Sequence, residues 1–134
     1  MHLFKTSGAT FNSVIKNEMH AFINYPQNIK TGDLILVSKN QKDLAPSEKQ
    51  IRYVMELKEI RGLRSGEIEK YWPGNEGRWN YLIICQNTKK LKKPLNLENA
   101  IGPVAAKKYK SVMTFKEIEH SDEIKILKFF EKET

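Results

Sequence analysis

The sequence has a single cysteine, so no internal disulfide can form. That residue, Cys85, ends an apolar run that begins at Tyr81. A thiol in such a run is typically buried and unreactive, and it behaves as a small hydrophobic side chain. The near absence of cysteine also favours a reducing compartment, so we expect a cytoplasmic protein.

Long hydrophobic runs are missing as well. No apolar stretch approaches the roughly 20 residues that a membrane-spanning helix needs, and the N-terminus lacks a signal-peptide pattern. The 134 residues suit one domain with one core, and we find no internal repeat or low-complexity linker. We therefore expect a single domain over residues 1–134 that does not cross a membrane.

Motifs for cofactors, metals and catalysis are also absent. The seven glycines are scattered, and none opens a helix after a strand as a phosphate-binding loop does. His2, His20 and His120 lie far apart, and no pair has the spacing of metal ligands. No recognised motif supplies a base for a Ser, Thr or Cys nucleophile. These absences favour a binding protein without cofactor or metal over an enzyme.

Positive charge, in contrast, is in excess, with a formal net charge of +7. Two clusters in segments that read as connections contribute much of it: Lys89, Lys90, Lys92 and Lys93, and then Lys107, Lys108 and Lys110. Basic patches of this kind favour a polyanion as partner, and nucleic acid is the commonest polyanion. The alternative is a lysine-rich surface that only keeps the protein soluble.

Apolar periodicity predicts a strand, a helix, several strands with long loops, and a closing helix. The first strand is at 3–5, and helical spacing predicts a helix over 11–22 with Thr10 as its N-cap. A continuous apolar run at 34–38 is typical of a strand buried on both faces. The remaining predicted elements are strands at 51–57 and 79–86, a short helix or turn at 94–102, a strand or turn at 110–115, and a helix capped by Ser121.

This order has too few helical crossovers for a doubly wound fold. We predict an α+β domain in which helices flank a small, strongly curved, barrel-like sheet of mixed or antiparallel strands. The 79–86 strand should be central, because both of its faces are apolar. His20 falls on the predicted first helix, where we expect it at the surface or boundary rather than as a ligand.

The segment from Tyr71 to Tyr81 is the most informative piece of the chain. It carries both tryptophans, and rings beside positive charge on an irregular segment suit an unstacked base. Trp72 precedes a Pro-Gly turn, so its ring either packs over the core or lines a pocket. Trp79 opens the following strand and could equally be core. Arg78 could hold a phosphate, stack, or pair with Glu76.

Polar side chains beside the predicted strand ends could converge on the same pocket. Lys39 and Asn40 directly follow the buried strand at 34–38. Ser7 lies at the first junction between strand and helix. Asn80 could read a base edge or simply face water. These positions join the aromatic segment as candidates for a binding site.

The order of elements resembles the PUA-like superfamily and, within it, the EVE and YTH branch. The matching marks are the first strand that runs into a helix near Phe11, and the Gly32-Asp33 pair before an apolar strand. A loop with Trp72-Pro73 between two strands and a closing helical segment follow in the same order. The resemblance covers nearly the whole chain and rests on order and spacing rather than on a signature motif.

The resemblance implies a pocket for one flipped-out nucleobase, typically a modified one such as a methylated purine or cytosine, held in an aromatic cage. Trp72 matches a cage tryptophan. The cage position near the first helix has no tryptophan here, and Phe11 or Trp79 would replace it. Some such domains read DNA in McrB-type restriction systems and others bind RNA, so a nuclease or ATPase partner would fit.

The candidate site therefore has two parts. Its base-binding candidates are Trp72, Trp79, Phe11, Ser7, Asn40, Asn80 and Tyr81. Its phosphate-binding candidates are Lys39, Arg78, Lys89, Lys90, Lys92, Lys93, Lys107 and Lys108. Base extrusion costs a few kcal/mol and stacking returns roughly 1–3 kcal/mol per base, while the lysines would add salt-dependent affinity for the backbone.

Two other classes of function stay open. ASCH-type relatives in the same superfamily include nucleoside amidohydrolases and ribonucleases, which would place a Lys and a Glu or Thr in the pocket. The candidates for such an enzyme are Lys39 with Glu56 or Glu67. The third class is a protein-interaction module with the aromatic loop as its hot spot.

Overall fold

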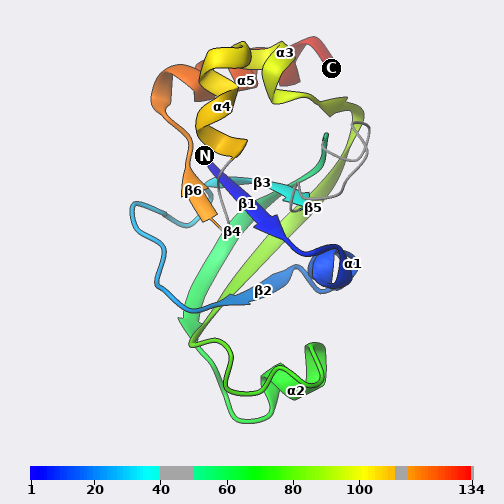
Figure 1. The fold of residues 1–134 in the computed structure, drawn as a ribbon, viewed down its shortest axis with the longest axis vertical. Coiled ribbons are helices and arrows are strands. Elements are labelled where there is room, and N and C mark those ends of the chain that lie inside the picture. Colours follow the sequence, from blue (N-terminus) through cyan, green and yellow to red (C-terminus); the bar gives the residue numbers. More distant parts are fainter. Residues whose placement is uncertain (40–49, 111–114, 134) are drawn as a thin grey trace.

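The computed structural model describes residues 1–39, 50–110 and 115–133. The elements in this part of the chain include both strands and helices (Figure 1). In chain order they are β1 (His2–Thr6), α1 (Gly8–Asn17), β2 (Met19–Phe22), β3 (Leu34–Lys39), β4 (Ile51–Gly62), α2 (Glu67–Tyr71), β5 (Tyr81–Leu95), α3 (Leu97–Ile101), α4 (Pro103–Lys110), β6 (Phe115–Glu117) and α5 (His120–Glu133).

The described strands form one mixed sheet in the order β2-β5-β4-β3-β1-β6. Strand β1 runs parallel to β3, and the other neighbours are antiparallel. The long strands β4 and β5 pair with three register shifts, and such irregularities bend and twist a strand pair. In Figure 1, helices α3, α4 and α5 gather at one end of these strands and α2 lies at the other. The predicted α+β class with a curved mixed sheet is confirmed.

Both faces of the sheet are buried. Leu3 and Leu36 belong to a core cluster with residues of α3, α4 and α5. Their neighbours Phe4 and Val37 point the other way, into a second cluster that includes Val14 of α1. Successive side chains of a strand face opposite sides, so two buried faces require an unbroken apolar run. This confirms the prediction for residues 34–38.

The first helix is shorter than predicted. It ends at Asn17, and Glu18 adopts a left-handed conformation with φ of 54°. Residues 19–22 then form β2, which pairs with β5. The helix predicted over 11–22 is therefore wrong at its C-terminal end, because pairing with a distant strand overrides the local helical propensity of those residues. The N-cap is Ser7 instead of Thr10.

The two lysine clusters lie on regular elements rather than on connections. The predicted 79–86 strand starts at Tyr81 and continues to Leu95, so it includes Lys89 and Lys90. Sheet pairing with β4 continues there, and buried Leu91 anchors that part of the strand. The second cluster lies on α4. Strand β5 does lie inside the sheet, between β2 and β4, as its apolar faces predicted. The part of the predicted 110–115 element at 111–114 lies outside the described residues.

Candidate functional site

A cavity of about 620 Å³ lies where the two edges of the curled sheet approach each other. The rings of Phe4 on β1 and His20 on β2 meet edge to face at 4.8 Å, although three strands separate them in sheet order. The cavity is lined by residues 4–7 and Thr10, by 20–28, by Arg78 and Trp79, and by 115–117. Strand curvature, rather than any local motif, therefore creates this space.

Trp79 is one of the aromatic side chains that line the cavity. The ring is half-buried and packs against His20 at 5.8 Å and against Trp72 at 5.6 Å between centroids. The guanidinium of Arg78 lies 4.8 Å from the Trp79 ring centroid, and its Nη1 donates to Asn75 Oδ1 at 3.0 Å. An indole face and a cation thus meet at the cavity, which is the pairing that a base and its phosphate require.

Hydroxyl groups line the opposite side, at the start of α1. Ser7 is the N-cap residue and is exposed. Its Oγ lies 3.0 Å from Thr10 Oγ1, and Thr10 Oγ1 also contacts Thr6 Oγ1. Each hydroxyl can donate and accept, so this group can follow the polar edge of a ligand.

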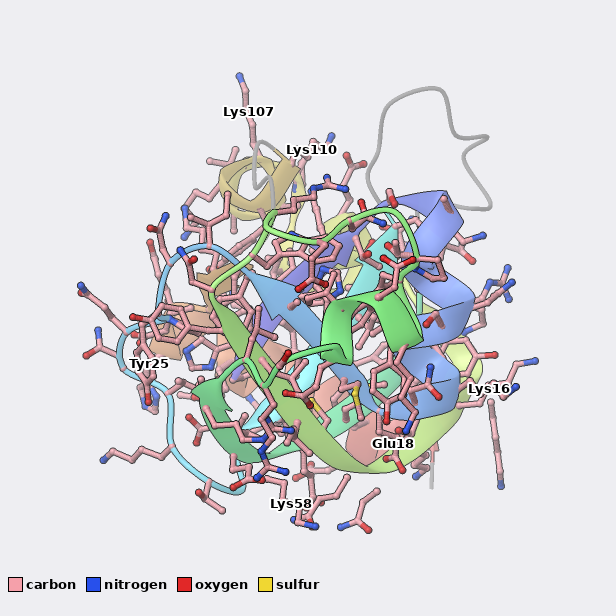
Figure 2. All side chains as sticks on the ribbon, turned by 90° about the horizontal axis from the view of Figure 1, so that it is seen from below. Lys16, Glu18, Tyr25, Lys58, Lys107 and Lys110 are labelled. Carbon is pink, nitrogen blue, oxygen red and sulfur yellow. The ribbon has the colours of Figure 1, made fainter. Side chains whose placement is uncertain are left out.

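The loop after β2 adds an exposed tyrosine to the cavity lining. Tyr25 is 55% exposed and lines the cavity. It projects from the molecule at the side opposite Lys16 in Figure 2. Its ring meets Tyr81 edge to face at 5.4 Å, and Tyr81 stacks on Phe22 at 6.2 Å. The predicted base-binding candidate Tyr81 is therefore one ring behind the cavity lining.

The surroundings lower the pKa of two basic side chains beside the cavity. Burial, and then the positive charge of Arg78, lowers the pKa of His20 to about 4. Burial likewise lowers the pKa of Lys5, which is only 4% exposed. Lys5 Nζ donates to the carbonyls of Tyr109 at 2.7 Å and Lys110 at 3.1 Å. Lys5 is therefore anchored to α4 rather than aimed at a ligand.

Trp72 lies behind the cavity. It is only 3% exposed and packs in a buried cluster with Ala21, Ile68 and Leu82. Its ring meets His20 edge to face at 5.8 Å. Of the two tryptophans in the predicted site, Trp79 lines the cavity and Trp72 supports it.

The other predicted base-binding residues are dispersed. Ser7 lines the cavity, whereas Phe11 is a residue of α1 whose side chain is buried in the core. Asn80 is exposed, and its side chain donates to the Ile23 carbonyl at 3.1 Å, so it holds the loop after β2. Asn40 lies outside the described residues. Lys39 has its ammonium 5.2 Å from the centroid of the Phe11 ring.

Of the predicted phosphate-binding residues, Arg78 lines the cavity. Lys89 and Lys92 instead line a separate cavity of about 400 Å³ beside Phe130. Lys90, Lys93 and Lys107 are exposed on β5 and α4. Figure 2 shows lysines projecting on several sides, among them Lys16, Lys58, Lys107 and Lys110. The basic character is thus spread over the surface and not confined to one face.

Lys108 is engaged in a local ion-pair network. Its Nζ lies 2.7 Å from Glu119 Oε2 and 3.0 Å from Asp122 Oδ2. The hydrogen bond to Glu119 is the main reason that the pKa of Lys108 is raised. Tyr109 also donates to Asp122, at 2.6 Å. This network ties α4 to α5, which gives Lys108 a structural role in the described chain.

The residues predicted for an enzyme do not meet at the cavity. Glu56 accepts a hydrogen bond from Asn87 at 3.1 Å, and Glu67 forms a bidentate pair with Arg61 at 2.6 and 2.7 Å. The hydrogen bond from Arg61 is the main cause that lowers the pKa of Glu67 to about 2. Neither carboxylate nor Lys39 lines the space that Trp79 borders.

Cys85 is buried, and burial raises its pKa to about 12, as expected for an inert thiol.

Sequence reasoning missed Tyr25, Thr10 and Asn24 as lining residues. Tyr25 had one available signal, since an aromatic residue in a Pro-containing loop must find a partner or stay exposed. In the described residues no helix is long and apolar enough to span a membrane, and no His, Cys, Asp or Glu group could hold a metal.

The fold is a curled α+β half-barrel of the PUA-like kind, with a cavity at its open edge. A crystal structure of an ASCH protein from Zymomonas mobilis is similar over 95% of this chain and 93% of its own, with a TM-score of 0.59 and 11% identity. Two mutant forms of that protein give TM-scores of 0.60 and 0.62, with 11% and 9% identity and coverage of 94–96% of each chain. Neither a protein-family model nor a curated protein sequence matches the chain.

Proposed function

We propose that this protein is a nucleic-acid-binding domain that holds one flipped-out base in the cavity beside Trp79. The observation that carries the proposal is the half-buried Trp79 ring with the Arg78 guanidinium over it, at a cavity of about 620 Å³. A ring that is neither fully packed nor fully solvated leaves one surface for a ligand, and every base has a π-face. The net charge of +7 supports a polyanionic partner.

A modified base is the ligand that the surroundings of Trp79 favour. Phe22 and Tyr25 add apolar surface to the cavity, and Ser7 and Thr10 add hydroxyl groups. An added methyl group would bury against the rings, whereas an unmodified base would leave that space unfilled. The expected cage in this chain is thus built on Trp79 and Tyr25, with Trp72 as its support.

The cations would act in two ways. Arg78 is close enough to Trp79 to engage the phosphate or the stacked base itself. The exposed lysines of β5 and α4 would contribute general attraction to the backbone, which is sequence-independent and falls with salt. In a cytoplasmic setting such a reader would deliver a nuclease or ATPase partner to a marked site.

The test is a fluorescence titration of short DNA and RNA strands that carry a methylated or an unmethylated base. We expect Trp79→Ala to weaken binding by roughly 1–3 kcal/mol and to remove the preference for the methylated base. Arg78→Ala should weaken both strands, and Arg64→Ala is its matched control, because Arg64 is exposed on a loop away from the cavity. Equal, purely salt-driven binding of both strands that survives Trp79→Ala would contradict the proposal.

A second candidate function is an ASCH-like hydrolase acting on RNA or modified nucleosides. The similarity in fold to the Zymomonas mobilis protein favours it, together with the Thr6 and Thr10 hydroxyls at the cavity. Release of product from modified nucleosides by the wild type, lost in Thr10→Val, would support it. The absence of turnover with tight binding of the same nucleosides would favour the binding function.

A further inference from the structure

This inference rests on the proposed function and concerns how the cavity would distinguish one base from another. Most lining groups give little discrimination, because rings stack on any base and hydroxyl groups both donate and accept. His20 differs from them. It lies on β2 with its ring enclosed by Phe4, Trp72 and Trp79 at centroid distances of 4.8, 5.8 and 5.8 Å. Three rings therefore fix the plane of the imidazole at the cavity wall.

Two polar atoms near His20 are buried without a hydrogen-bond partner. They are His20 Nδ1 and the indole nitrogen Nε1 of Trp72. The indole N–H can only donate, and the imidazole of a neutral histidine has one nitrogen that accepts. The two rings are in edge-to-face contact, with an interplanar angle of 84°. A buried polar group without a partner is costly, so a rotation that joins the Trp72 N–H to His20 Nδ1 would be favourable.

The protonation state of His20 follows from its surroundings. Burial and the facing charge of Arg78 hold the pKa of His20 at about 4, so the ring is neutral at physiological pH. The other charged groups that line the cavity are Lys5, Lys116 and Glu117. A neutral imidazole carries one proton, and if Nδ1 accepts from Trp72 that proton is on Nε2. Nδ1 is enclosed, which leaves Nε2 as the ring nitrogen that can serve a ligand.

We infer that His20 selects bases with a carbonyl oxygen rather than an amino group at C4 of a pyrimidine or C6 of a purine, because its Nε2–H donates to that oxygen while Trp72 holds Nδ1 as an acceptor. Enzymes and readers that extrude a base contact its Watson–Crick edge, and at this position uracil, thymine and hypoxanthine carry the oxygen whereas cytosine and adenine carry the amino group. A fixed donor pairs with the oxygen and leaves an amino group without a partner. The substrate class is thus a keto base, such as thymine, uracil or hypoxanthine.

The experiment uses fluorescein-labelled single strands that differ at one position. Three pairs exchange an amino group for a carbonyl oxygen: cytosine and uracil, 5-methylcytosine and thymine, and adenine and hypoxanthine. An abasic strand reports backbone binding alone. In each pair that binds above the abasic strand, we expect the keto member to bind about tenfold more tightly.

Variants test the two residues separately. His20→Phe keeps a ring in the aromatic cluster, and we expect the ratio within each pair to fall to about one while abasic binding is unchanged. Trp72→Phe removes the indole N–H together with the five-membered ring but keeps an aromatic ring, and it should lower the ratio, because the proton on His20 is then no longer fixed. His120→Phe is the matched control, since the His120 side chain is 85% exposed on α5 and should leave the ratio unchanged.

The outcomes are decisive for each step. Equal binding within the pairs, or tighter binding of the amino members, by the wild type overturns the inference but not the proposed base pocket. A ratio that persists in His20→Phe also overturns it. If no strand binds above the abasic one, the proposed function fails and this inference fails with it. The wild-type ratios decide the keto preference even if His20→Phe does not fold, and His20→Gln then replaces it.

Discussion

The state of His20 predicts that acid destabilises this protein well above the range where carboxylates titrate. The pKa of His20 is about 4 in the folded chain, against an ordinary value of 6.5 that an unfolded chain would restore. Between these values the unfolded state binds more protons than the folded state, so the free energy of unfolding falls as the pH falls. Above about pH 7 this group contributes no pH dependence.

The magnitude follows from the two pKa values. One pH unit of difference corresponds to about 1.4 kcal/mol, so the full interval corresponds to about 3 kcal/mol. Between pH 7.5 and pH 5.0 the expected loss of unfolding free energy is about 2 kcal/mol, because this interval covers only part of the range between the unfolded and the folded pKa of His20. His2, whose pKa burial also lowers, adds a loss of the same sign.

The assay is urea unfolding of wild type and His20→Phe at pH 7.5 and pH 5.0, followed by far-ultraviolet circular dichroism. The phenyl ring does not titrate, so the variant should lose about 2 kcal/mol less than the wild type over this interval. His120→Phe, with its exposed side chain, should behave as the wild type does. A variant that loses as much stability as the wild type would refute the neutral, buried state of His20.

Three further predictions concern residues outside the cavity lining or at its edge. Trp72→Ala should lower the free energy of unfolding by about 3–5 kcal/mol in urea, whereas Trp79→Ala should act mainly on binding. The ion pair of Glu67 with Arg61 stabilises the wild type above pH 4.5, and this stability is lost as the pH falls toward 2. Glu67→Gln should remove it, so the free energy of unfolding of the variant should fall less steeply with pH over this range than that of the wild type. Cys85 should react with a thiol reagent at pH 8 only after unfolding; rapid reaction in the folded state would contradict its burial.

Local sequence patterns predicted much of the fold. The apolar run at 34–38 and the alternating run from Ile51 specified β3 and β4, because a buried strand must be apolar on each buried face. The first helix was predicted to end at Phe22 but ends at Asn17, because Met19 and Phe22 continue the helical spacing. Only pairing with β5 shows that these residues form a strand, and that pairing joins segments about sixty residues apart.

The aromatic segment shows the same limit at the site. Residues 71–81 were recognisable as a group of rings beside a cation, and Arg78 and Trp79 do line a cavity. The choice between the two tryptophans was not accessible from the sequence. Trp72 precedes a Pro-Gly turn and was expected at the pocket, yet the chain buries it against Ala21 and Leu82. Burial depends on which distant residues close over a ring, and a turn motif holds no such information.

The sequence by itself determined a basic α+β domain with one inert thiol and an aromatic segment in the middle, because composition and periodicity depend only on neighbours in the chain. The tertiary structure alone decided which rings are accessible. Curling of the sheet brings β1 and β2 together, so that residues 4–7, 20–28 and 78–79 share one cavity. The same curvature sets His20 between two tryptophans and Phe4, where burial keeps it neutral. Those contacts span most of the chain, and their energies exist only once the sheet has closed.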